Sequence, residues 1–558
     1  MITIEQRRPR KMPGEYSLFI TFDYQKELVD CMKNLDPPVN FDKKTREWET
    51  TLTNLSSMIN SFSEYDSIKL KLLKEEPLVY KDYVLNNYKT KSFKHQLEAV
   101  QYGLNHDSFL LLDEPGLGKS KSAINLAEEL HNRYGIQHCL IVCGINSLKF
   151  NWLNEISKHS YLSGRILGQR FNKRGTLHIG KISDRVNDLN TPLDEFFVIT
   201  NIETLRDDNI IKGILKGKNQ FDMIIVDEIH TCKNVSAIQT KHLLKLSEIK
   251  YKLGLTGTLL ITDPLDCYAP LKFIKAETGT NTNFKYYYCN FSGPFNNILT
   301  SYKNLNVLKE QLNKNSLRRT KDLLDLPPKN VIHEYLEMSP EQEAFYQDIK
   351  NGEIKQADLV NISTTSLLAL VARLRQISDC PHILSSKNIP CTKIDRAVDL
   401  AEQILSNPNE KVVLFANFKA TTDMLMQKLA KYNPLLATGD VPDNKVNRAV
   451  KDFQENPKCR VFIATWQRCG TGLTLNAASN MIMCGVPWSS SECEQVEDRI
   501  HRIGTKKPVF IYYLWTKNTF DEKVKQIIED KGLLSNFIVN DNLPPQMIDR
   551  LKQLIADL

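Results

Sequence analysis

The chain has 558 residues, of which 41% are hydrophobic and 25% are charged. These proportions are ordinary for packed globular domains, so they exclude a fibrous or wholly disordered protein, and the length predicts about three or four domains. The 73 basic and 66 acidic residues leave a net charge of +7, which is mild for this size and suggests a polyanionic partner. Twelve cysteines are scattered without a C-x-x-C pair, which argues against zinc or a disulfide framework and fits a reducing compartment.

The N-terminal segment, residues 1–88, is the first predicted domain. Residues 1–13 are polar and basic and lack the apolar region of a secretory signal, and no apolar run in the chain reaches membrane-spanning length. We therefore expect no membrane association and a location in the cytoplasm or nucleoid, or in the nucleus of a eukaryotic host. The segment carries aromatic and charged residues and one strand-like run at 16–22.

A nucleotide-binding loop is predicted by the run Asp113-Glu114-Pro115-Gly116-Leu117-Gly118-Lys119-Ser120. An apolar, strand-like stretch precedes the run and a helix-forming stretch follows it, which is the context such a loop needs. Gly116 and Gly118 let backbone N–H groups approach phosphate oxygens, and the new helix adds its positive end. Lys119 can reach the outer phosphates, and the Ser120 hydroxyl can ligate Mg²⁺. The usual pattern has glycine where this chain has Asp113, so an ordinary strand–helix turn stays an alternative on this run alone.

Strand-like apolar runs alternate with helical stretches in two separate parts of the chain. The first set lies between residues 109 and 255, and the second lies between residues 412 and 514. Such alternation predicts parallel sheets that are covered on both faces, and therefore two α/β lobes. Residues 281–395 lack this alternation, and their sequence predicts mostly helices.

Two acidic residues follow the apolar run 223–226 in the sequence Asp227-Glu228-Ile229-His230. A buried strand that ends in acids places carboxylates at its carboxyl end, where ligands bind in open parallel sheets. Asp227 can hold Mg²⁺ through water, and Glu228 can orient or deprotonate the water that attacks the γ-phosphate. The alternative is a solvated acidic turn after a core strand.

A pair of arginines, Arg499 and Arg502, lies in the run 495–504 near the end of the second lobe. Their spacing of three places them on one face of a predicted helix. Planar guanidinium groups suit recognition of a γ-phosphate, and an arginine finger contributes on the order of 10³ or more in rate. A basic helix face without a catalytic role is the alternative.

These motifs, in this order, resemble those of superfamily-two helicase ATPases of the Swi/Snf type. The resemblance covers nearly all of residues 90–535, and the Asp113 form of the loop is typical of this family. It implies an α/β fold with two RecA-like parallel-sheet lobes, helical family-specific insertions and a small α+β N-terminal domain. It divides the rest of the chain into a first, ATP-binding lobe at 89–280, a mostly helical insertion and linker at 281–395, a second lobe at 396–535 and a helical tail at 536–558.

The resemblance also implies ATP and Mg²⁺ as cofactors and assigns roles to residues. The catalytic residues would be Lys119, Glu228, Gln495, Arg499 and Arg502. The nucleotide would be bound by Gln96, which reads the adenine, by each residue from Asp113 to Ser120, and by Gly470 and Gly472. The metal ligands would be Ser120 and Asp227. Hydrolysis would be coupled to DNA through His230, Thr256 and Thr258. The DNA contacts would include Trp152, Asn201, Thr465, Thr471 and Trp488.

The chain departs from the family pattern at two positions. Leu259 stands where the family usually has proline, and Thr505 stands where it has glutamine. The first departure puts the local turn in doubt more than the chemistry. Between the lobes, the runs 317–321 and 326–329 match a family hallmark.

The N-terminal segment resembles, more weakly, the HARP domain that precedes the motor in annealing helicases. The match rests on residues around 20–24, 41–48 and 55–62. Lys43, Arg46 and Trp48 are the candidate DNA contacts, because aromatic rings stack on unpaired bases and basic groups meet phosphates. The alternative is that Trp48 and its aromatic neighbours form the core of a small helix–strand domain.

Together, these features predict an ATP-dependent translocase on duplex or forked DNA that acts without sequence preference. The HARP-like segment favours fork remodelling or strand annealing in replication, repair or recombination. The alternatives are a strand-separating helicase, a remodeller that displaces proteins, and a catalytically silent DNA-binding scaffold. The retention of Lys119 and Glu228 argues against the scaffold. The abundance of Lys, Asn and Ile is compatible with an AT-rich genome such as that of a virus or phage.

Overall fold

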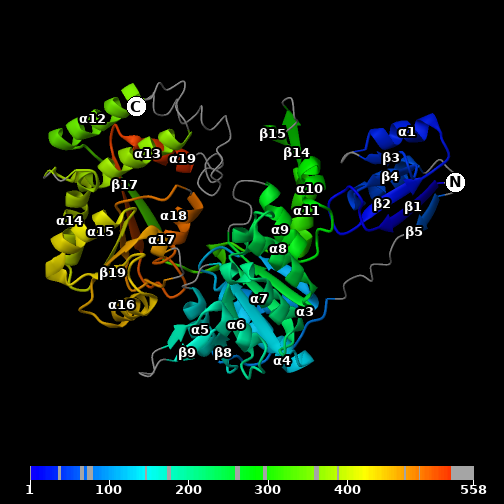
Figure 1. Cartoon of the computed structure of the whole chain (residues 1–558), viewed down its shortest axis with the longest axis horizontal. Coiled ribbons are helices and arrows are strands. Elements are labelled where there is room, and N and C mark those ends of the chain that lie inside the picture. Colours follow the sequence, from blue (N-terminus) through cyan, green and yellow to red (C-terminus); the bar gives the residue numbers. More distant parts are fainter. Residues whose placement is uncertain are drawn as a thin grey trace. The chain divides into compact units, whose positions relative to one another are not determined.

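The computed structural model describes residues 2–35, 39–62, 68–71, 80–144, 148–171, 177–257, 264–292, 298–356, 364–385, 387, 389–469, 473–488 and 490–529. The chain divides into two compact units. The first consists of Met1–Glu114 and Gly118–Thr320, and the second consists of Pro115–Leu117 and Lys321–Leu558. Figure 1 traces the chain from the N-terminal strands in blue to the second unit, which runs from green through yellow and orange to red.

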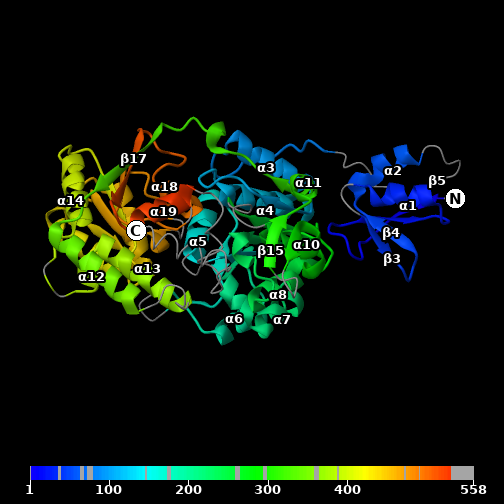
Figure 2. The same ribbon diagram turned by 90° about the horizontal axis from the view of Figure 1, so that it is seen from above.

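A five-stranded sheet with two helices forms the N-terminal part of the first unit. Its strand order is β3-β4-β2-β1-β5, antiparallel except for the parallel pair β1–β5. The elements are β1 (Ile2–Arg7), β2 (Ser17–Thr21), α1 (Lys26–Lys33), β3 (Asn40–Asp42), β4 (Glu47–Thr50), α2 (Leu55–Ser61) and β5 (Ile68–Lys71). Alternate residues such as Ile4 and Ile20 face one side of the sheet and belong to one hydrophobic cluster with Met32 of α1 and Met58 of α2. Figure 2 shows both helices beside the strands of this sheet. The predicted α+β N-terminal domain is therefore present.

A seven-stranded parallel sheet is the centre of the first lobe, in the order β16-β6-β13-β12-β7-β11-β8. Its strands are β6 (Ser108–Leu111), β7 (His138–Cys143), β8 (Gly164–Ile166), β11 (Phe197–Asn201), β12 (Phe221–Asp227), β13 (Tyr251–Leu255) and β16 (Ser316–Leu317). Alternate residues of β7 belong to two separate hydrophobic clusters, because helices cover both faces of the sheet. This is why the central strands are apolar along their whole length.

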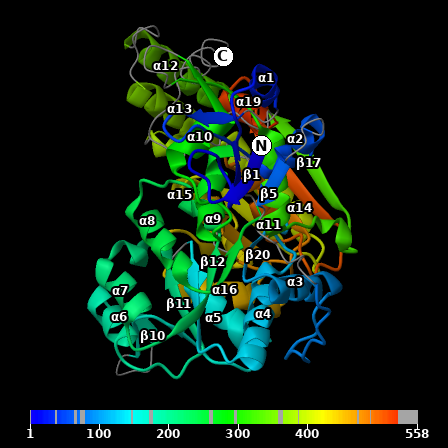
Figure 3. The same ribbon diagram turned by 90° about the vertical axis from the view of Figure 1, so that its right-hand side faces the viewer.

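Helices of the first lobe divide between the two faces of the sheet, as Figure 3 shows. One face packs against α3 (Lys94–Asn105), α4 (Lys119–Tyr134) and α5 (Leu148–His159). The other packs against α6 (Ile182–Leu189), α7 (Asp208–Lys216), α8 (Ile238–Lys245), α9 (Tyr268–Phe273), α10 (Asn281–Tyr288) and α11 (Leu305–Asn315). Two antiparallel strand pairs complete the lobe, formed by β9 (Gln169–Phe171) with β10 (Leu177–Ile179) and by β14 (Cys289–Ser292) with β15 (Ile298–Tyr302).

The second unit contains a six-stranded parallel sheet in the order β17-β22-β21-β18-β20-β19. Its strands are β17 (Lys329–Leu336), β18 (Val412–Ala416), β19 (Leu435–Ala437), β20 (Val461–Thr465), β21 (Asn480–Met483) and β22 (Val509–Thr516). One face packs against α14 (Thr392–Leu405) and α15 (Lys419–Lys428). The other packs against α12 (Pro340–Gln356), α13 (Thr364–Asp379), α16 (Asp443–Glu455), α18 (Ser490–Glu497) and α19 (Phe520–Glu529), and the short helix α17 (Trp466–Cys469) follows β20. With two parallel-sheet lobes, the predicted fold class is confirmed.

The segment 281–395 does not form a separate insertion. Its first part, including α10 and α11, belongs to the first unit, because Leu308 and Leu312 of α11 are buried in that core. From Lys321 onward the chain belongs to the second unit, where β17 pairs with β22 over eight residues. The chain thus passes from one unit to the other at Thr320, inside the stretch predicted as insertion and linker. The predicted tail at 536–558 lies outside the described residues.

Candidate active site

The predicted phosphate loop leaves the carboxyl end of β6 and leads into α4. Gly116 and Gly118 have φ angles of 90° and 81°, in the left-handed region that favours glycine. Gly118 is the N-cap of α4. A Cβ at Gly118 would collide with the amide group of Gln96, whose side chain is buried beside the loop. The backbone N–H of Phe93 donates to Gln96 Oε1 at 3.1 Å, which fixes this side chain at the start of α3.

Lys119 opens α4, and its side chain turns back to the loop. The ammonium donates to the carbonyl oxygen of Asp113 at 2.7 Å. Ser120 follows in the first turn of the same helix. The loop therefore has the backbone geometry, the lysine and the helix start that phosphate binding requires.

Asp113 has a structural role that the sequence did not reveal. Its carboxylate is buried, and Arg319 donates to both oxygens, from Nε to Oδ1 at 2.9 Å and from Nη2 to Oδ2 at 2.5 Å. Arg319 also donates to the carbonyl oxygen of His95 in α3, and its own carbonyl accepts from the N–H of Glu114 at 3.0 Å. Its side chain therefore ties the loop to α3 and to the segment after β16, and the predicted contact of Asp113 with nucleotide stays a prediction.

The acidic pair lies on the same edge of the sheet as the loop. Asp227 is the last residue of β12, and β12 is separated from β6 only by β13. The indole N–H of Trp152 donates to Asp227 Oδ2 at 2.9 Å, and the N–H of Glu228 donates to Oδ1 at 3.1 Å. Burial raises the pKa of Asp227 and the charge of Glu228 raises it further, whereas the Trp152 hydrogen bond and the Lys119 charge act in the opposite direction. Lys119 and Asp227 are thus close enough to interact electrostatically.

Glu228 has a backbone conformation that is uncommon for a residue with a side chain. Its φ is 51° and its ψ is 50°, in the left-handed region, and such positions cluster at functional sites. Its Oε2 atom lies 3.2 Å from Nδ1 of His230, and that nitrogen lies 2.9 Å from the hydroxyl of Thr256. Thr256 follows β13 and donates its N–H to the carbonyl of Leu111 at 3.2 Å. The structure thus joins Glu228, His230 and Thr256, three of the predicted residues, in one chain of contacts.

Two predicted DNA contacts of the first lobe are buried. Trp152 is 2% exposed and orients Asp227. Asn201 is 5% exposed, and its Oδ1 atom accepts from Thr204 at 2.7 Å and from Lys149 at 3.3 Å. Both side chains thus lie in the interior of the first lobe, and their contact with DNA stays a prediction. Thr258 lies outside the described residues.

Arg499 and Arg502 do not lie on one helix face, so that prediction is corrected. The helix α18 ends at Glu497, and both arginines follow in turns. The reason is tertiary, because the carbonyl of Arg499 accepts from the N–H of Leu475 at 2.9 Å instead of continuing the helix. Arg502 donates from Nη1 to the Thr474 hydroxyl at 2.8 Å. Gln495 is half-buried within α18.

Thr505, where the family usually has glutamine, stabilises the turn that carries Arg502. Its hydroxyl accepts from the N–H of Arg502 at 3.1 Å and donates to the carbonyl of Ile500 at 2.8 Å. Two acids that precede the turn are also held. Glu497 accepts from Lys329 at 2.6 Å, and Asp498 pairs with Lys321, while burial raises the pKa of Asp498. Both lysines belong to the hallmark runs: Lys321 precedes β17 and Lys329 is the first residue of β17. Their pairing with Glu497 and Asp498 joins residues that are far apart in the sequence, so the sequence did not reveal it.

Other predicted contacts of the second lobe pack inward. Thr465 ends β20 and is 8% exposed. The guanidinium of Arg375 lies 4.2 Å from the centroid of the Trp488 ring, and Phe520 packs on it edge-on. Gly470, Thr471 and Gly472 lie outside the described residues.

The candidate DNA contacts of the N-terminal segment include one buried residue and two exposed residues. Trp48 is 9% exposed within the small core, and its ring lies 4.7 Å from that of Phe41 on the neighbouring strand. The packing alternative therefore holds for Trp48. Lys43 and Arg46 are exposed in the β3–β4 turn.

Comparison with models of known protein families shows which family the chain belongs to. A family model described as SNF2-related domain matches residues 24–383, and one described as helicase conserved C-terminal domain matches residues 392–504. The chain belongs to the SNF2-related family. These domains are the enzyme domains of a DNA-dependent ATPase or helicase.

Among the helices that the structure describes, none has both the length and the apolar character that crossing a membrane requires.

Several curated relatives are similar over most of the chain. The DNA annealing helicase and endonuclease ZRANB3 of Bos taurus is 26% identical over 82% of this chain, which covers 41% of that protein. The SWI/SNF-related matrix-associated actin-dependent regulator of chromatin subfamily A-like protein 1 homolog of Caenorhabditis elegans is 25% identical over 91% of this chain and 73% of its own length. The DNA repair and recombination protein RDH54 of Saccharomyces cerevisiae is 27% identical over 78% of this chain and 51% of its own length. The chain thus spans between two fifths and three quarters of these relatives.

One solved structure, described as the Sulfolobus solfataricus SWI2/SNF2 ATPase core in complex with dsDNA, is 20% identical to this chain. It covers 86% of this chain and 98% of its own, with a TM-score of 0.38.

Proposed function

We propose that this protein is an ATP-dependent DNA translocase that binds ATP and Mg²⁺ at the first lobe. The observation that carries the proposal is the placement of Lys119 and Asp227 at the carboxyl edge of one parallel sheet, near enough for their charges to interact. The residues present fit a divalent cation, because Asp227 is a half-buried carboxylate next to a second acid, and a cation would offset both the desolvation of Asp227 and the repulsion between the two acids. When bound, Mg²⁺ supplies charge neutralisation on the phosphates.

Each residue of the site has a proposed task. Gln96 reads the adenine, and Lys119 binds the outer phosphates. Ser120 and Asp227 hold the metal. Glu228 aligns the attacking water, and its contact with His230 gives the site a path toward Thr256.

Arg499, Arg502 and Gln495 complete the proposal by acting on the γ-phosphate. The turn around Arg502 is fixed by Thr474 and Thr505, so the guanidinium is held in one orientation. A fixed guanidinium stabilises charge that develops in the transition state without reorganisation at the moment of reaction.

The proposed partner is DNA, in duplex or forked form and without sequence preference. The names of the relatives support this partner, since ZRANB3 is described as a DNA annealing helicase and RDH54 as a DNA repair and recombination protein. The net charge of +7 suits a phosphate backbone. Such a partner places the protein inside the cell, at the nucleoid or in the nucleus.

Fork remodelling or strand annealing is the finer part of the proposal. It rests on the annealing helicase among the relatives and on the HARP-like resemblance of the N-terminal segment. In that segment the exposed Lys43 and Arg46 are the proposed DNA contacts. The second candidate functions are strand separation and displacement of bound proteins.

The test compares ATP hydrolysis by the full-length protein on single-stranded, duplex and forked DNA of equal length, while labelled strands report the outcome. We expect duplex or forked DNA to stimulate turnover and opened strands to anneal. Net unwinding would favour the strand-separating helicase, and release of a bound protein with unchanged strands would favour the remodeller. If no DNA substrate stimulates ATP hydrolysis, the result would favour a catalytically silent DNA-binding scaffold.

A further inference from the structure

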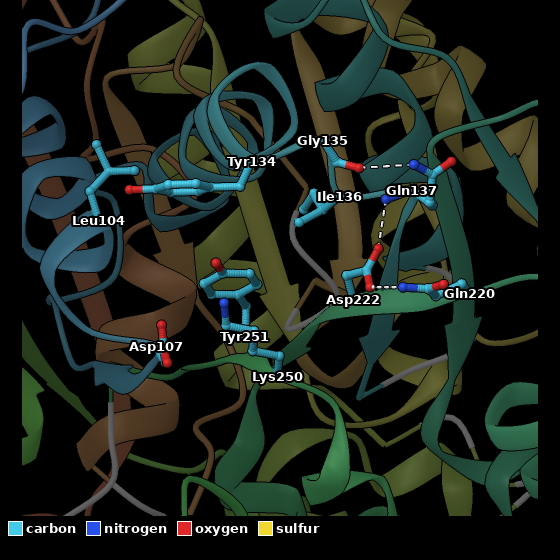
Figure 4. Close-up of a pocket in the computed structure, with 10 residues that line it drawn as sticks. All are labelled: Leu104, Asp107, Tyr134, Gly135, Ile136, Gln137, Gln220, Asp222, Lys250 and Tyr251. Atoms are coloured by element: carbon cyan, nitrogen blue, oxygen red, sulfur yellow. Dashed lines mark hydrogen bonds between the residues drawn. The ribbon is translucent and has the colours of Figure 1, made fainter.

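A cavity of about 740 Å³ opens at the amino-terminal edge of the first-lobe sheet (Figure 4). Its lining comes from residues at the starts of β6, β7, β12 and β13 and from the ends of α3 and α4, and includes Asp107, Tyr134, Asp222, Lys250 and Tyr251. The phosphate loop leaves β6 at the other end of that strand. The cavity and the candidate active site therefore lie at opposite edges of the same sheet.

Two tyrosines face one another across this cavity. The rings of Tyr134 and Tyr251 are nearly parallel, at 17°, and their centroids are 6.5 Å apart. Carbon atoms in direct contact lie only about 3.5–4 Å apart, so the two rings are too far apart to touch face to face, and their spacing is slightly below the roughly 7 Å that one planar group between two rings requires. Tyr251 is 7% exposed at the start of β13, whereas Tyr134 is 50% exposed at the end of α4. We call this pair the tyrosine slot.

The electrostatic surroundings of the tyrosine slot favour a cation. Figure 4 draws the carboxylates of Asp107 and Asp222 on either side of Tyr251. Asp222 accepts from the Gln137 N–H at 2.7 Å and from the Gln220 amide at 2.6 Å, which fixes its orientation. Asp107 is exposed, and its side chain makes no hydrogen bond or ion pair within the described part of the chain.

Lys250 already shows that this site attracts positive charge. Its ammonium lies 4.6 Å from the centroid of the Tyr251 ring. A hydrogen bond with Tyr251 raises the pKa of Lys250, and the charges of Asp107 and Asp222 raise it further. The two carboxylates and the one ammonium leave the lining with an excess negative charge.

We propose that the tyrosine slot binds the guanidinium group of an arginine that a protein partner presents. A guanidinium is planar, stacks on aromatic faces and donates from its edge to carboxylates, and these are the groups that the slot offers. A lysine ammonium is not planar and would fill the slot poorly. A nucleobase is planar, but the phosphates attached to it would meet Asp107 and Asp222 and be repelled.

This assignment gives the first lobe a docking point that does not compete with ATP. The slot lies across the sheet from Lys119 and Asp227, so a bound partner leaves the nucleotide edge free. The partner is defined by its chemistry, as a basic protein segment with an accessible arginine.

The experiment measures binding of two short amidated peptides to the full-length protein by saturation-transfer NMR. One peptide carries a single arginine between glycines, and the other carries lysine instead. We expect the arginine peptide to bind, and Tyr134→Ala and Asp107→Asn each to weaken it on the order of five- to tenfold. Tyr134→Phe should retain binding because it keeps the ring. Tyr286→Ala is the matched control, since Tyr286 is also 50% exposed in the same lobe but does not line the cavity.

Several results would overturn the proposal. Equal binding of the lysine peptide, unchanged binding in Tyr134→Ala, or no binding of either peptide would each do so. A short oligodeoxyadenylate that binds the protein and is lost from Tyr134→Ala would show that the slot takes a nucleobase instead. Unchanged DNA-stimulated ATP hydrolysis in the Tyr134 and Asp107 variants confirms that they are folded.

Discussion

At the scale of single residues, Glu228 differs from its acidic neighbour Asp227 in backbone conformation and in the partner of its side chain. Asp227 is half-buried and its carboxylate is fixed by Trp152, whereas the Glu228 side chain is 33% exposed and lies beside His230 with its backbone in the left-handed region. A fixed carboxylate suits a metal, and a carboxylate that reaches solvent suits a water molecule. The structure thus supports a division of labour between adjacent residues.

Substitution of Lys119 or Glu228 tests this division. Lys119→Ala should remove nucleotide binding and turnover together, and Glu228→Gln should lower DNA-stimulated turnover at least about 10²-fold while nucleotide binding persists. The measurement is ATP hydrolysis with a parallel binding assay using a fluorescent nucleotide. Lys212→Ala, an exposed lysine on α7, is the control and should change neither. Substantial turnover in Glu228→Gln would remove Glu228 from the proposed role.

The residues whose positions in the fold the sequence predicted are those whose signal is local. The glycines of the loop, Lys119 and Asp227 could be placed because a strand, a turn and a helix follow one another within a few residues. Arg319 was missed as a partner of Asp113, since the two lie 206 positions apart and no spacing rule connects them. The orientation of Trp152 on α5 toward Asp227 at the end of β12 also depends on a helix and a strand that only the folded lobe brings together.

At the scale of elements, the link between α9 and α10 anchors the N-terminal segment of the first unit. The Glu277 carboxylate accepts from the N–H of Gly14 at 2.7 Å and from that of Gly279 at 2.5 Å. Thr278 adds two donors to the carbonyl of Gly14, its N–H at 3.1 Å and its hydroxyl at 3.0 Å. Burial raises the pKa of Glu277 from 4.5 to about 7, against the lowering effect of these hydrogen bonds.

This anchor should weaken as pH rises through neutrality. Because the pKa of Glu277 is higher in the folded than in the unfolded chain, its contribution is fully present below about pH 4.5 and is lost as pH rises through 7. We expect the thermal midpoint of the protein to fall between pH 5 and 8 more than that of Glu277→Gln, which stays uncharged. The pKa change of Glu277 corresponds to a loss of at most about 3 kcal/mol in the free energy of unfolding over this pH range.

Glu248→Gln is the control for this comparison, since Glu248 is a solvent-exposed glutamate of the same lobe. Parallel pH profiles for the wild-type protein and Glu277→Gln would show that Glu277 does not control the anchor.

Elements also show where sequence patterns fail. The helix predicted to carry Arg499 and Arg502 ends early because the carbonyl of Arg499 pairs with the N–H of Leu475 from a different segment. Residues 281–320 read as an insertion because they lack alternating strands, yet α11 completes the core of the first lobe. In both cases tertiary contacts overrode the local pattern, which is the usual reason for such errors.

At the scale of the whole molecule, the charge of +7 and the SNF2-related domains lead to an expectation about salt. A protein that tracks the DNA backbone releases counterions when it binds. For about four phosphate contacts, the affinity for DNA should fall on the order of 10²-fold between about 50 and 200 mM salt. Fluorescence anisotropy with a labelled duplex measures this slope, and the affinity for nucleotide without DNA, in the same buffers, is the control. A flat response for DNA would argue against a motor that tracks the backbone.

The pairing of β17 with β22 has a consequence for dividing the protein into parts. The helicase C-terminal family match begins at residue 392, but β17 at Lys329–Leu336 is the strand that covers the edge of β22. A fragment that starts at residue 392 would leave eight residues of β22 without their ladder partner, and an uncovered strand edge invites aggregation. Expression of the second lobe alone should therefore begin before Lys329, at the point where the chain enters the second unit.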